Sequence, residues 1–504
     1  MLDFLKKRPM LLCAVVGCGL SVLGTFAEKA LFWICPLILL LIVLACFKRA
    51  KAELVLAAVL ALAIALSTLV SLKAIEKANL LDDTTCTGEF VVVEKPTNKG
   101  DYYYTTVQAV DCAPIEKGTK LAVTYNSGEM QLGEYINATL SLSSMENEDL
   151  KYSFYSDRIF LRGYLKSFRH TAESDGVLTA VGSVREWIKN TIFKFYGKPE
   201  AATMLALITG DKSYFTDTFY SNVKSAGVAH VMVVSGMHLS IIIALALYFA
   251  NRLFYNPYFK ALVICIVTIA VMAVCGFTMS IMRAGVTYLL MALALVLGRE
   301  NTPENTLGAA VSIILLCNPL AIRSVAFQLS VLSTFAILVV ALPLSDYLIN
   351  HKIIKQNWLK TIVPMLLISL SALIFTSPVT IYVFGYVSNV SLITNLLISW
   401  AVSLAMYTCL LGFSIPFLRP VLFLFSDLLV RYINLLINFF GSLPFATTRT
   451  PGWLAFVMVG VIIIILGLLI ACKERQKVLK LEEVRIKKFK ERGKLKWQSL
   501  TKRS

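Results

Sequence analysis

The stretch Gly227–Ile241, GVAHVMVVSGMHLSI, decides how the rest of the chain is interpreted. It opens an apolar run that continues through Leu247, and a helix of about 20 apolar residues crosses a bilayer. Its first half nevertheless contains four residues that are polar or interrupt a helix: His230, Ser235, Gly236 and His238. Because polar groups at membrane depth are costly, they face a protein interior or a water-filled cavity. The stretch therefore predicts a transmembrane segment with a polar lining.

The composition indicates an integral membrane protein. Of the 504 residues, 57% are hydrophobic and only 16% are charged, and the mean hydropathy is +0.72. A soluble domain has about 25% charged residues. The net charge of +17 is uneven, because residues 473–504 hold thirteen Lys and Arg against four Glu. We interpret 473–504 as a basic cytoplasmic tail by the positive-inside rule; binding of anionic lipid or nucleic acid is the alternative.

Residues 1–76 predict N-terminal transmembrane helices. Three cations precede the first apolar run, Met10–Phe26, and two more runs follow at once, Leu31–Phe47 and Leu54–Leu72. A secretory signal peptide is excluded because no small-residue cleavage site separates these runs. The basic turn between the second and third runs is predicted to lie inside, so the third run ends outside.

Residues 80–180 predict a small β domain outside the membrane. Alternating stretches such as EFVVVE, KLAVTY and YINATLSL are separated by polar or glycine-containing turns, which is typical of short antiparallel strands. Such a pattern suits a small barrel or a sandwich, and an OB-like barrel is one candidate. Cys86 and Cys112 are the two cysteines of this domain. In an oxidising compartment they are expected to form a disulfide, with two buried free thiols as the alternative.

Neither a metal site nor catalysis is predicted. The other nine cysteines lie within or at the edge of apolar runs, and no CxxC pair or Cys/His array with zinc spacing is present. Ser235-Gly236 with His238 suggests an intramembrane hydrolase, but we expect the pair and the histidine, taken as two residues apart on a helix, to point to different faces. The chain has no GxxxxGK[ST] segment for nucleotide binding. We therefore expect no cofactor and no enzymatic activity.

Two segments connect the β domain to the opening stretch. Apolar residues recur at helical spacing in 183–197, which predicts an amphipathic helix lying in the membrane interface; a packed surface helix is the alternative. A helix–loop–helix approach follows, and Gly210, Asp211 and Lys212 form its predicted turn.

Residues 200–472 predict a transmembrane bundle. Its apolar runs lie near 229–250, 258–275, 281–298, 305–317, 326–344, 361–384, 389–415, 420–442 and 453–472. With the N-terminal runs, the fold class is a polytopic α-helical membrane protein of about twelve transmembrane or re-entrant helices with an inserted extracytoplasmic OB-like β domain. Basic residues concentrate in alternate connections, which predicts that the β domain is outside and the C-terminus cytoplasmic.

Four polar clusters occur within this bundle, at 230–238, 276–286, 318–335 and 376–397. Pro378 and Gly385 are predicted to interrupt the helix in the last cluster, and such interruptions are tolerated where the backbone is buried in protein or faces water. Interhelical hydrogen bonding is the alternative role for the Ser, Asn and Gln residues. The candidates for a channel or polar core are Asp211, Lys212, His230, Ser235, Gly236, His238, Arg283, Arg323, Gln328, Ser330 and Asn395.

The order of these clusters resembles the ComEC-type competence proteins. AHVMVVSGMHLSI is similar to the signature segment of that family, and GFTMSIMRAGV, NPLAIRSVAFQLSVLSTF and SPVTIYVFGYVSNVSLITNLL are similar to its later motifs in the same order. ALITGDKSYF resembles the family's approach to the signature. Each motif alone is weak, but five in order over residues 205–397 are specific. Met279 departs from the pattern, because the family often has a proline there.

The resemblance implies a membrane channel for single-stranded DNA during natural transformation. It implies an OB-like module that holds single strands, for which Tyr102, Tyr103 and Tyr104 are candidate stacking residues. Many members carry a C-terminal metallo-β-lactamase-like domain, and its HxHxDH motif does not occur after Cys472. We therefore expect a separate nuclease, a cytoplasmic ATPase, a DNA receptor and membrane lipid as partners. A transporter of another anionic polymer or lipid-linked substrate, or an intramembrane hydrolase, is the alternative.

Two expectations concern geometry. We expect Arg283, His238, Gln328 and Asn395 to face one polar cavity. Because a strand of phosphates needs cations in a low-dielectric passage, we also expect Arg283, Arg323 and Lys212 to form its electropositive mouth.

Overall fold

The structure is a computed structural model that describes residues 9–26, 51–98, 102–126, 130–145, 154–172, 176–253, 256–351 and 353–469. The predicted helix 31–47 and the basic tail 473–504 lie outside these residues. Most of the described chain is helical. Six helices are long and apolar enough to cross a membrane: α10 (Pro257–Val274), α11 (Met279–Val296), α13–α14 (Val325–Asn350), α15 (Leu359–Phe384), α16 (Ser391–Ser414) and α17 (Arg419–Gly441).

Three shorter apolar helices accompany them: α9 (Gly236–Leu253), α12 (Pro303–Cys317) and a C-terminal helix, Leu454–Leu469. At the N-terminal end, α2 (Pro9–Phe26) and α4 (Lys51–Asn79) pack on α12 through a cluster that includes Ala14, Ile64 and Val311. The prediction of a helical membrane protein is confirmed in this coarse form. The predicted count of about twelve helices is not confirmed by these lengths.

The β domain is a closed barrel. Its strands are β1 (Thr85–Val92), β3 (Tyr103–Asp111), β4 (Lys120–Tyr125), β5 (Tyr135–Ser143) and β6 (Ile159–Ala172), with a short β2 (Thr97–Asn98) at one end. The strand order β1-β5-β6-β4-β3 is closed by pairing of β3 with β1, and only β4 and β6 pair in parallel. Alternate residues point inward, so Phe90, Leu121 and Leu140 fill a core without solvent access.

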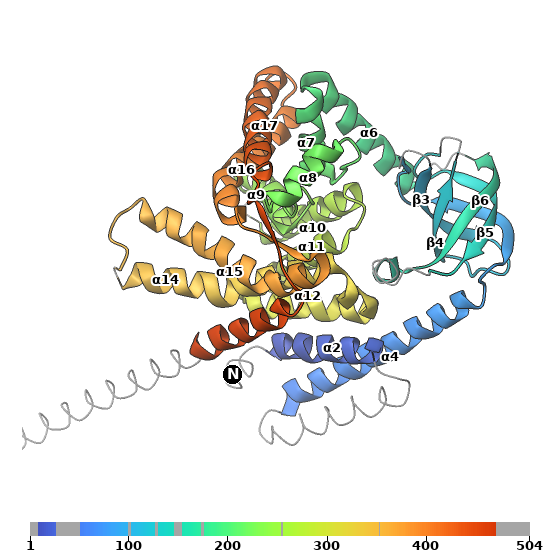
Figure 1. The fold of residues 1–504 in the computed structure, drawn as a ribbon, viewed down its shortest axis with the longest axis horizontal. Coiled ribbons are helices and arrows are strands. Elements are labelled where there is room, and N and C mark those ends of the chain that lie inside the picture. Colours follow the sequence, from blue (N-terminus) through green and yellow to red (C-terminus); the bar gives the residue numbers. More distant parts are fainter. Residues whose placement is uncertain are drawn as a thin grey trace, which may run out of the picture.

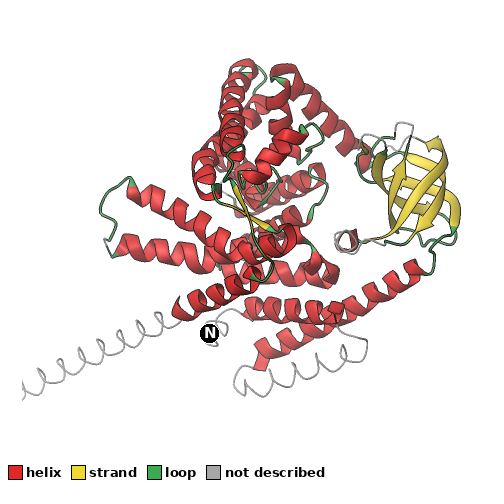
Figure 2. Cartoon of the chain, in the orientation of Figure 1, coloured by secondary structure: helices red, strands yellow, loops and turns green. Residues whose placement is uncertain are grey.

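The barrel lies beside the bundle (Figures 1 and 2). It is inserted between α4 and α6 (Val177–Phe195), after which come α7 (Lys198–Thr209) and α8 (Asp217–Ser225). Helix α6 buries Ile188 and Ile192 in the bundle core and leaves Val184 and Trp187 exposed. The Trp187 ring also lies 5.2 Å from that of Phe413. This packing fits the surface-helix alternative, and a position of α6 in the membrane interface stays a prediction.

Two predicted helix limits are wrong. The run predicted near 229–250 becomes helical only at Gly236, because Gly227 has φ +73° and turns the chain before it. Pro378 does not interrupt α15, which ends at the left-handed Gly385. A proline at 378 leaves the carbonyl of Ile374 without its helical donor. The Ser377 hydroxyl donates to that carbonyl at 2.7 Å, which compensates for the missing bond.

One long helix contains a π-helical segment. Val325–Ala336 (α13) and Leu342–Asn350 (α14) are joined by Ile337–Ala341, which is π-helical. Ala336 and Val340 pack there against Phe375 of α15. Single π-turns inside α-helices are uncommon and often occur at functional sites.

Candidate functional site

The signature stretch leaves the helical conformation and packs against the fourth polar cluster. Gly227 lies so close to β7 (Tyr386–Ser388) and α16 that a Cβ there would be 2.5 Å from Ser391 Cβ and 2.8 Å from Ser388 Cβ. Ser388 donates to the carbonyl of Ser225 at 2.7 Å, and Ser391 donates to that of Gly227 at 3.3 Å. Two motifs separated by about 160 residues along the chain are thereby held together.

Ser235 and His238 cap the start of α9. The Ser235 hydroxyl accepts from the backbone N–H of Met237 at 3.3 Å, while His238 Nδ1 accepts from the backbone N–H of Ser235 at 3.2 Å. This reciprocal arrangement corresponds to a capping box, with histidine in place of the usual Glu or Gln. The expectation that Ser235 and His238 point to different faces is wrong: the two are three residues apart, a spacing that brings side chains together, and Ser235 Oγ lies 3.1 Å from His238 Nδ1. His238 is fully buried, whereas His230 is exposed.

Arg283 joins the first three polar clusters. It lies on α11 with only 6% of its surface exposed, and its Nε donates to Ser330 Oγ on α13 at 2.7 Å. Ser280 donates to the same oxygen at 3.3 Å. Gly236 faces the guanidinium, because a Cβ there would be 3.0 Å from Arg283 Nη2. The signature helix therefore comes close to the buried guanidinium at Gly236, while Ser330 accepts the hydrogen bond from Arg283.

The remaining candidates lie elsewhere. Gln328 donates to the carbonyl of Ile322 at 2.7 Å, at the end of the short helix that contains Arg323. Asn395 donates to Ser391 Oγ at 3.3 Å, and its Oδ1 is buried without a hydrogen bond. No hydrogen bond within the described chain links Gln328 or Asn395 to Arg283. One cavity lined by all four residues, and a mouth shared by Arg283, Arg323 and Lys212, stay predictions.

Sequence reasoning missed a charged pair on α17. Arg431 Nε donates to Asp427 Oδ2 at 2.8 Å; the Asp427 side chain is 6% exposed and that of Arg431 is 59% exposed. One turn further, Asn434 Oδ1 accepts from Thr203 of α7 at 2.8 Å. The signal was available, because Asp427, Arg431 and Asn434 follow at i, i+4 and i+7 within an apolar run. The Asn434–Thr203 bond holds α17 against α7, whereas the Asp427–Arg431 pair lies within α17.

The outer face of β6 presents a strip of cations and an aromatic ring. Arg162, Tyr164 and Lys166 alternate with inward Leu161, Gly163 and Leu165, and all three are exposed. Sequence reasoning had selected Tyr102, Tyr103 and Tyr104 instead. Tyr102 is exposed, but Tyr103 stacks on Tyr125 at 5.2 Å and Tyr104 packs against Phe154. Consecutive strand residues point to opposite faces, so these three tyrosines do not form one strip.

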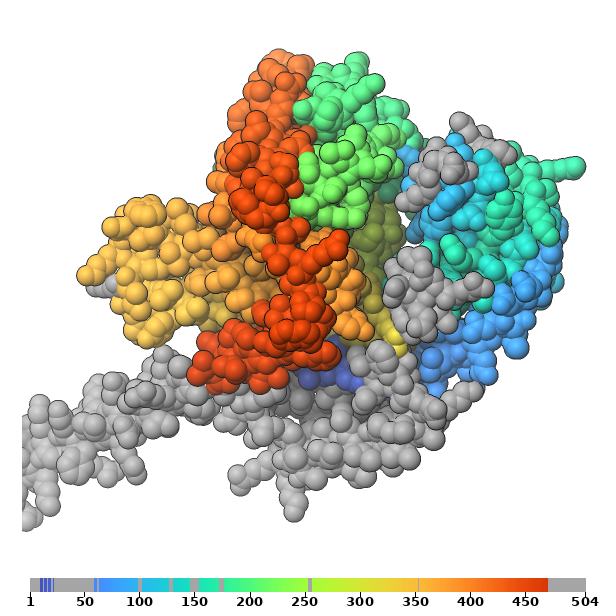
Figure 3. Space-filling model, viewed as in Figure 1, coloured from blue at the N-terminus to red at the C-terminus, as the bar shows by residue number. Residues whose placement is uncertain are grey.

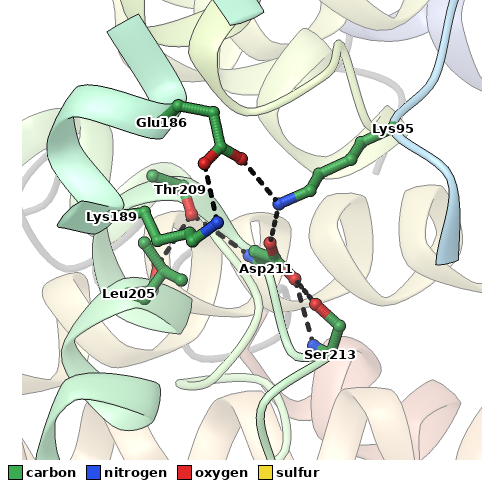
Figure 4. A network of polar contacts seen from close by, with 7 residues as sticks. All are labelled: Lys95, Glu186, Lys189, Leu205, Thr209, Asp211 and Ser213. Carbon is green, nitrogen blue, oxygen red and sulfur yellow. Dashed lines mark hydrogen bonds and ion pairs between the residues drawn. The ribbon is translucent and has the colours of Figure 1, made fainter. Parts of the chain in front are cut away.

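A polar network attaches the barrel to the approach loop (Figure 4). Lys95, which follows β1, lies 3.1 Å from Glu186 of α6 and 3.6 Å from Asp211. Lys189 donates to Glu186 at 2.6 Å. Burial alone would raise the pKa of Glu186, but the hydrogen bonds from Lys189 and Lys95 outweigh it and lower that pKa. Asp211, predicted as a turn residue, also caps the loop by accepting from the backbone N–H of Ser213 at 3.0 Å.

A second attachment lies at the end of α12. Asn318 donates to the carbonyl of Ser156 at 2.6 Å, and Arg158 donates to the carbonyl of Cys317. Ser156 and Arg158 precede β6, whereas Lys95 lies between β1 and β3. Two different loops of the barrel therefore contact the bundle, which fixes the orientation of the barrel.

Cys86 and Cys112 lie side by side in the barrel core. Both are buried free thiols in this structure, and both belong to the core of the barrel. Burial and the contact with Cys112 raise the pKa of Cys86 to about 12. The structure corresponds to the reduced alternative, and the disulfide stays a prediction that this proximity makes testable.

The long apolar helices, the polar contacts among them and the attached barrel define a helical membrane protein with one β domain. Residues 207–476 match the model of a family described as Competence protein. This match covers more than half of the 504 residues, and the chain belongs to the competence protein family. The resemblance found in the motifs is confirmed, and the family indicates a role in DNA uptake. Searches of curated proteins and of solved structures give no match.

Proposed function

We propose that the protein is the channel through which single-stranded DNA crosses the cytoplasmic membrane during natural transformation. The observation that carries this beyond the family is the strip on β6, where Arg162 and Lys166 flank Tyr164 on the outside of the barrel. Proteins that bind single strands without sequence preference combine cations for the backbone with aromatic rings for the bases. An acidic or featureless barrel face would have disfavoured DNA.

We further propose that the barrel is OB-like. Its five main strands pair in the order first, second, third, fifth, fourth and back to the first, with the third and fifth parallel. That closed five-stranded arrangement supports the OB-like interpretation. Its first and fourth connections contain Lys95 and Ser156, which contact the bundle. A strand held on β6 would therefore be delivered close to the signature stretch.

In this proposal, the bundle supplies the passage and the partners supply the energy. The barrel faces the outside and the C-terminus the cytoplasm, because Lys and Arg concentrate in the opposite connections. The buried Arg283 holds the helices at the polar contact with Gly236 and Ser330. The chain itself has no catalytic role, so a separate nuclease, a cytoplasmic ATPase and a DNA receptor complete the pathway.

The function is tested by uptake of labelled DNA. Cells that lack the gene should retain surface-bound DNA and accumulate none inside, and the purified chain in liposomes should admit a labelled single strand to a nuclease-protected interior. Arg162→Gln/Lys166→Gln should weaken binding of single strands by the purified chain. Normal cytoplasmic DNA in the deletion strain would refute the channel. Cysteine labelling of intact cells near Asn98 but not near Lys494 tests the orientation, and the reverse pattern would overturn it.

A further inference from the structure

Two lysines lie in the segment that runs from α7 to the signature stretch. Lys212 is half-buried in the loop after α7, and Lys224 is exposed on α8. Burial lowers the pKa of Lys212, and the neighbouring charge of Lys224 lowers it further. Among the described residues, the ion pairs of this region use Lys95 and Lys189 but neither Lys212 nor Lys224. Lys212 and Lys224 therefore add positive charge to this surface, where Asp217 is the one acidic residue of α8.

Aromatic rings continue from these cations across the surface. Lys224 Nζ lies 4.3 Å from the centroid of the Tyr220 ring, one turn earlier on α8, and this ring is 37% exposed. Tyr386 of β7 comes next, because Ser388 of the same strand donates to the carbonyl of Ser225 at the end of α8 at 2.7 Å. Its cross-strand partner on β8 (Thr447–Arg449) is the exposed Arg449. Two lysines, two tyrosine rings and one arginine are therefore distributed from the approach loop to the β7–β8 ribbon.

The position of this track favours a ligand in water over lipid. Aromatic and basic residues also occur at membrane–water interfaces. Here, however, the exposed positions of α8 between the rings and cations are polar, including Asp217 and Ser221. The loop before α8 is bound to the barrel through Asp211 and Lys95. In Figure 3, α8 (light green) lies at the surface of the bundle on the side that faces the barrel.

We infer that Lys212, Lys224 and Tyr220, extended by Tyr386 and Arg449, bind the single strand after it leaves the barrel. The cations contact successive phosphates, and the two tyrosines stack on bases. This track adjoins Gly227, because Ser388 of the same ribbon packs against it. The inference rests on the proposed function and moves the electropositive mouth from Arg283, which is buried and bonded to Ser330, to exposed side chains around α8.

Binding is measured with the full chain in phosphatidylcholine nanodiscs and a fluorescent oligothymidylate. Lys212→Gln/Lys224→Gln should weaken binding at least tenfold at low salt. It should also reduce the slope of log K against log salt by about 1.4, or about 0.7 for each lost phosphate contact. Tyr220→Leu should weaken binding about fivefold or more with little change in slope. The matched control, Lys355→Gln/Lys360→Gln, removes exposed Lys355 from the loop between α14 and α15 and exposed Lys360 from the first turn of α15, and should bind as wild type.

A photo-crosslinking residue at Ser221 identifies the ligand directly. Adducts with the oligonucleotide support the track, and adducts with lipid alone overturn it in favour of a membrane contact. If the wild type binds the strand and Arg162→Gln/Lys166→Gln weakens it, while the Lys212/Lys224 pair matches its control, the track is wrong and the proposed function survives. If the wild type binds no single strand under any salt condition, both proposals fail.

Discussion

Arg283 in the bundle and Arg162 on the barrel are the same side chain in opposite surroundings. Arg283 is 6% exposed and bonded to Ser330 on a neighbouring helix. Arg162 is exposed on β6 beside Tyr164. A buried charge depends on every partner, since removing one leaves an unpaired group in a low dielectric. A surface charge acts mainly through its contribution to the local potential. Replacing the buried Arg283 should therefore abolish DNA uptake, whereas replacing the exposed Arg162 should weaken DNA binding only partially.

The largest effect is expected from Arg283→Glu. It removes the bond to Ser330 and places a carboxylate in the same buried position, at a cost of about 3–5 kcal/mol. DNA should remain at the cell surface and fail to reach the cytoplasm. Arg283→Lys should be nearly as severe, because lysine has no Nε in the position that contacts Ser330.

The matched control for Arg283 is Arg162→Glu. It should weaken single-strand binding several-fold while leaving the thermal unfolding of the detergent-solubilised protein unchanged. Labelled-DNA uptake and unfolding midpoints check both variants together. Normal uptake by Arg283→Glu would remove the distinction between the two arginines.

Two left-handed glycines, Gly227 of the signature stretch and Gly276 of the second polar cluster, differ in how tightly they are packed. Gly227→Ala combines a positive φ with a Cβ only 2.5 Å from Ser391 Cβ, and we expect a loss of several kcal/mol and of uptake. Gly276 has φ +74° but nothing within 4 Å of its Cβ. Gly276→Ala should therefore cost only about 1 kcal/mol from backbone strain. Equal unfolding midpoints for the two variants would show that packing against Ser391 does not fix the turn.

The reduced barrel should lose stability at high pH. An unfolded cysteine ionises near pH 8.5, whereas the folded pKa of Cys86 is raised to about 12. Above about pH 8.5 the unfolded state therefore binds fewer protons than the folded state. Stability falls as pH rises towards 12, by about 1 kcal/mol per pH unit. The control is Cys86→Ala/Cys112→Ala, which has no thiol to ionise and should not show this loss of stability at high pH.

Oxidation separates the two cysteine alternatives. Without reductant, a non-reducing digest should contain a peptide that links Cys86 to Cys112, and the high-pH loss of stability should disappear with the thiols. Quantitative alkylation of both residues in unfolded protein prepared without reductant would show that no disulfide forms.

The smallest effect is expected at the attachment of the barrel. Lys95→Gln removes the bridge from Lys95 to Glu186 and Asp211, and partly exposed ion pairs contribute up to about 1 kcal/mol each. Hydrogen exchange in the loop 210–216 should accelerate while global stability stays nearly constant. Lys77→Gln, which breaks an exposed pair with Glu116 away from that loop, is the control. Identical hydrogen-exchange rates in the loop 210–216 of the two variants would show that Lys95 does not stabilise that loop.

The sequence allowed the helical class and the family to be predicted, because long apolar runs and the order of five motifs do not depend on tertiary contacts. It did not predict that Val228–Ser235 is non-helical. That outcome depends on Ser388 and Ser391, which hold Gly227 from about 160 residues away. Nor did it predict which tyrosines face outward. Three consecutive tyrosines resemble a strip in a sequence, while a strand alternates their directions and Tyr125 covers one of them.

The π-helical segment at Ile337–Ala341 separates the direction of the side chains from the course of the helix. Each residue of an α-helix turns it by about 100°, so one additional residue in a turn rotates everything beyond it by that amount while the axis continues. Residues of α13 and α14 that share a face by simple counting therefore face different neighbours. Deleting one residue from this segment would restore an unbroken α-helix and leave Ser345 and Asp346 in nearly the same direction relative to Ser330, because the wide turn already accommodates that residue. The number of residues in the helix 325–350 can thus change by one at this segment without changing the directions of the side chains at its two ends.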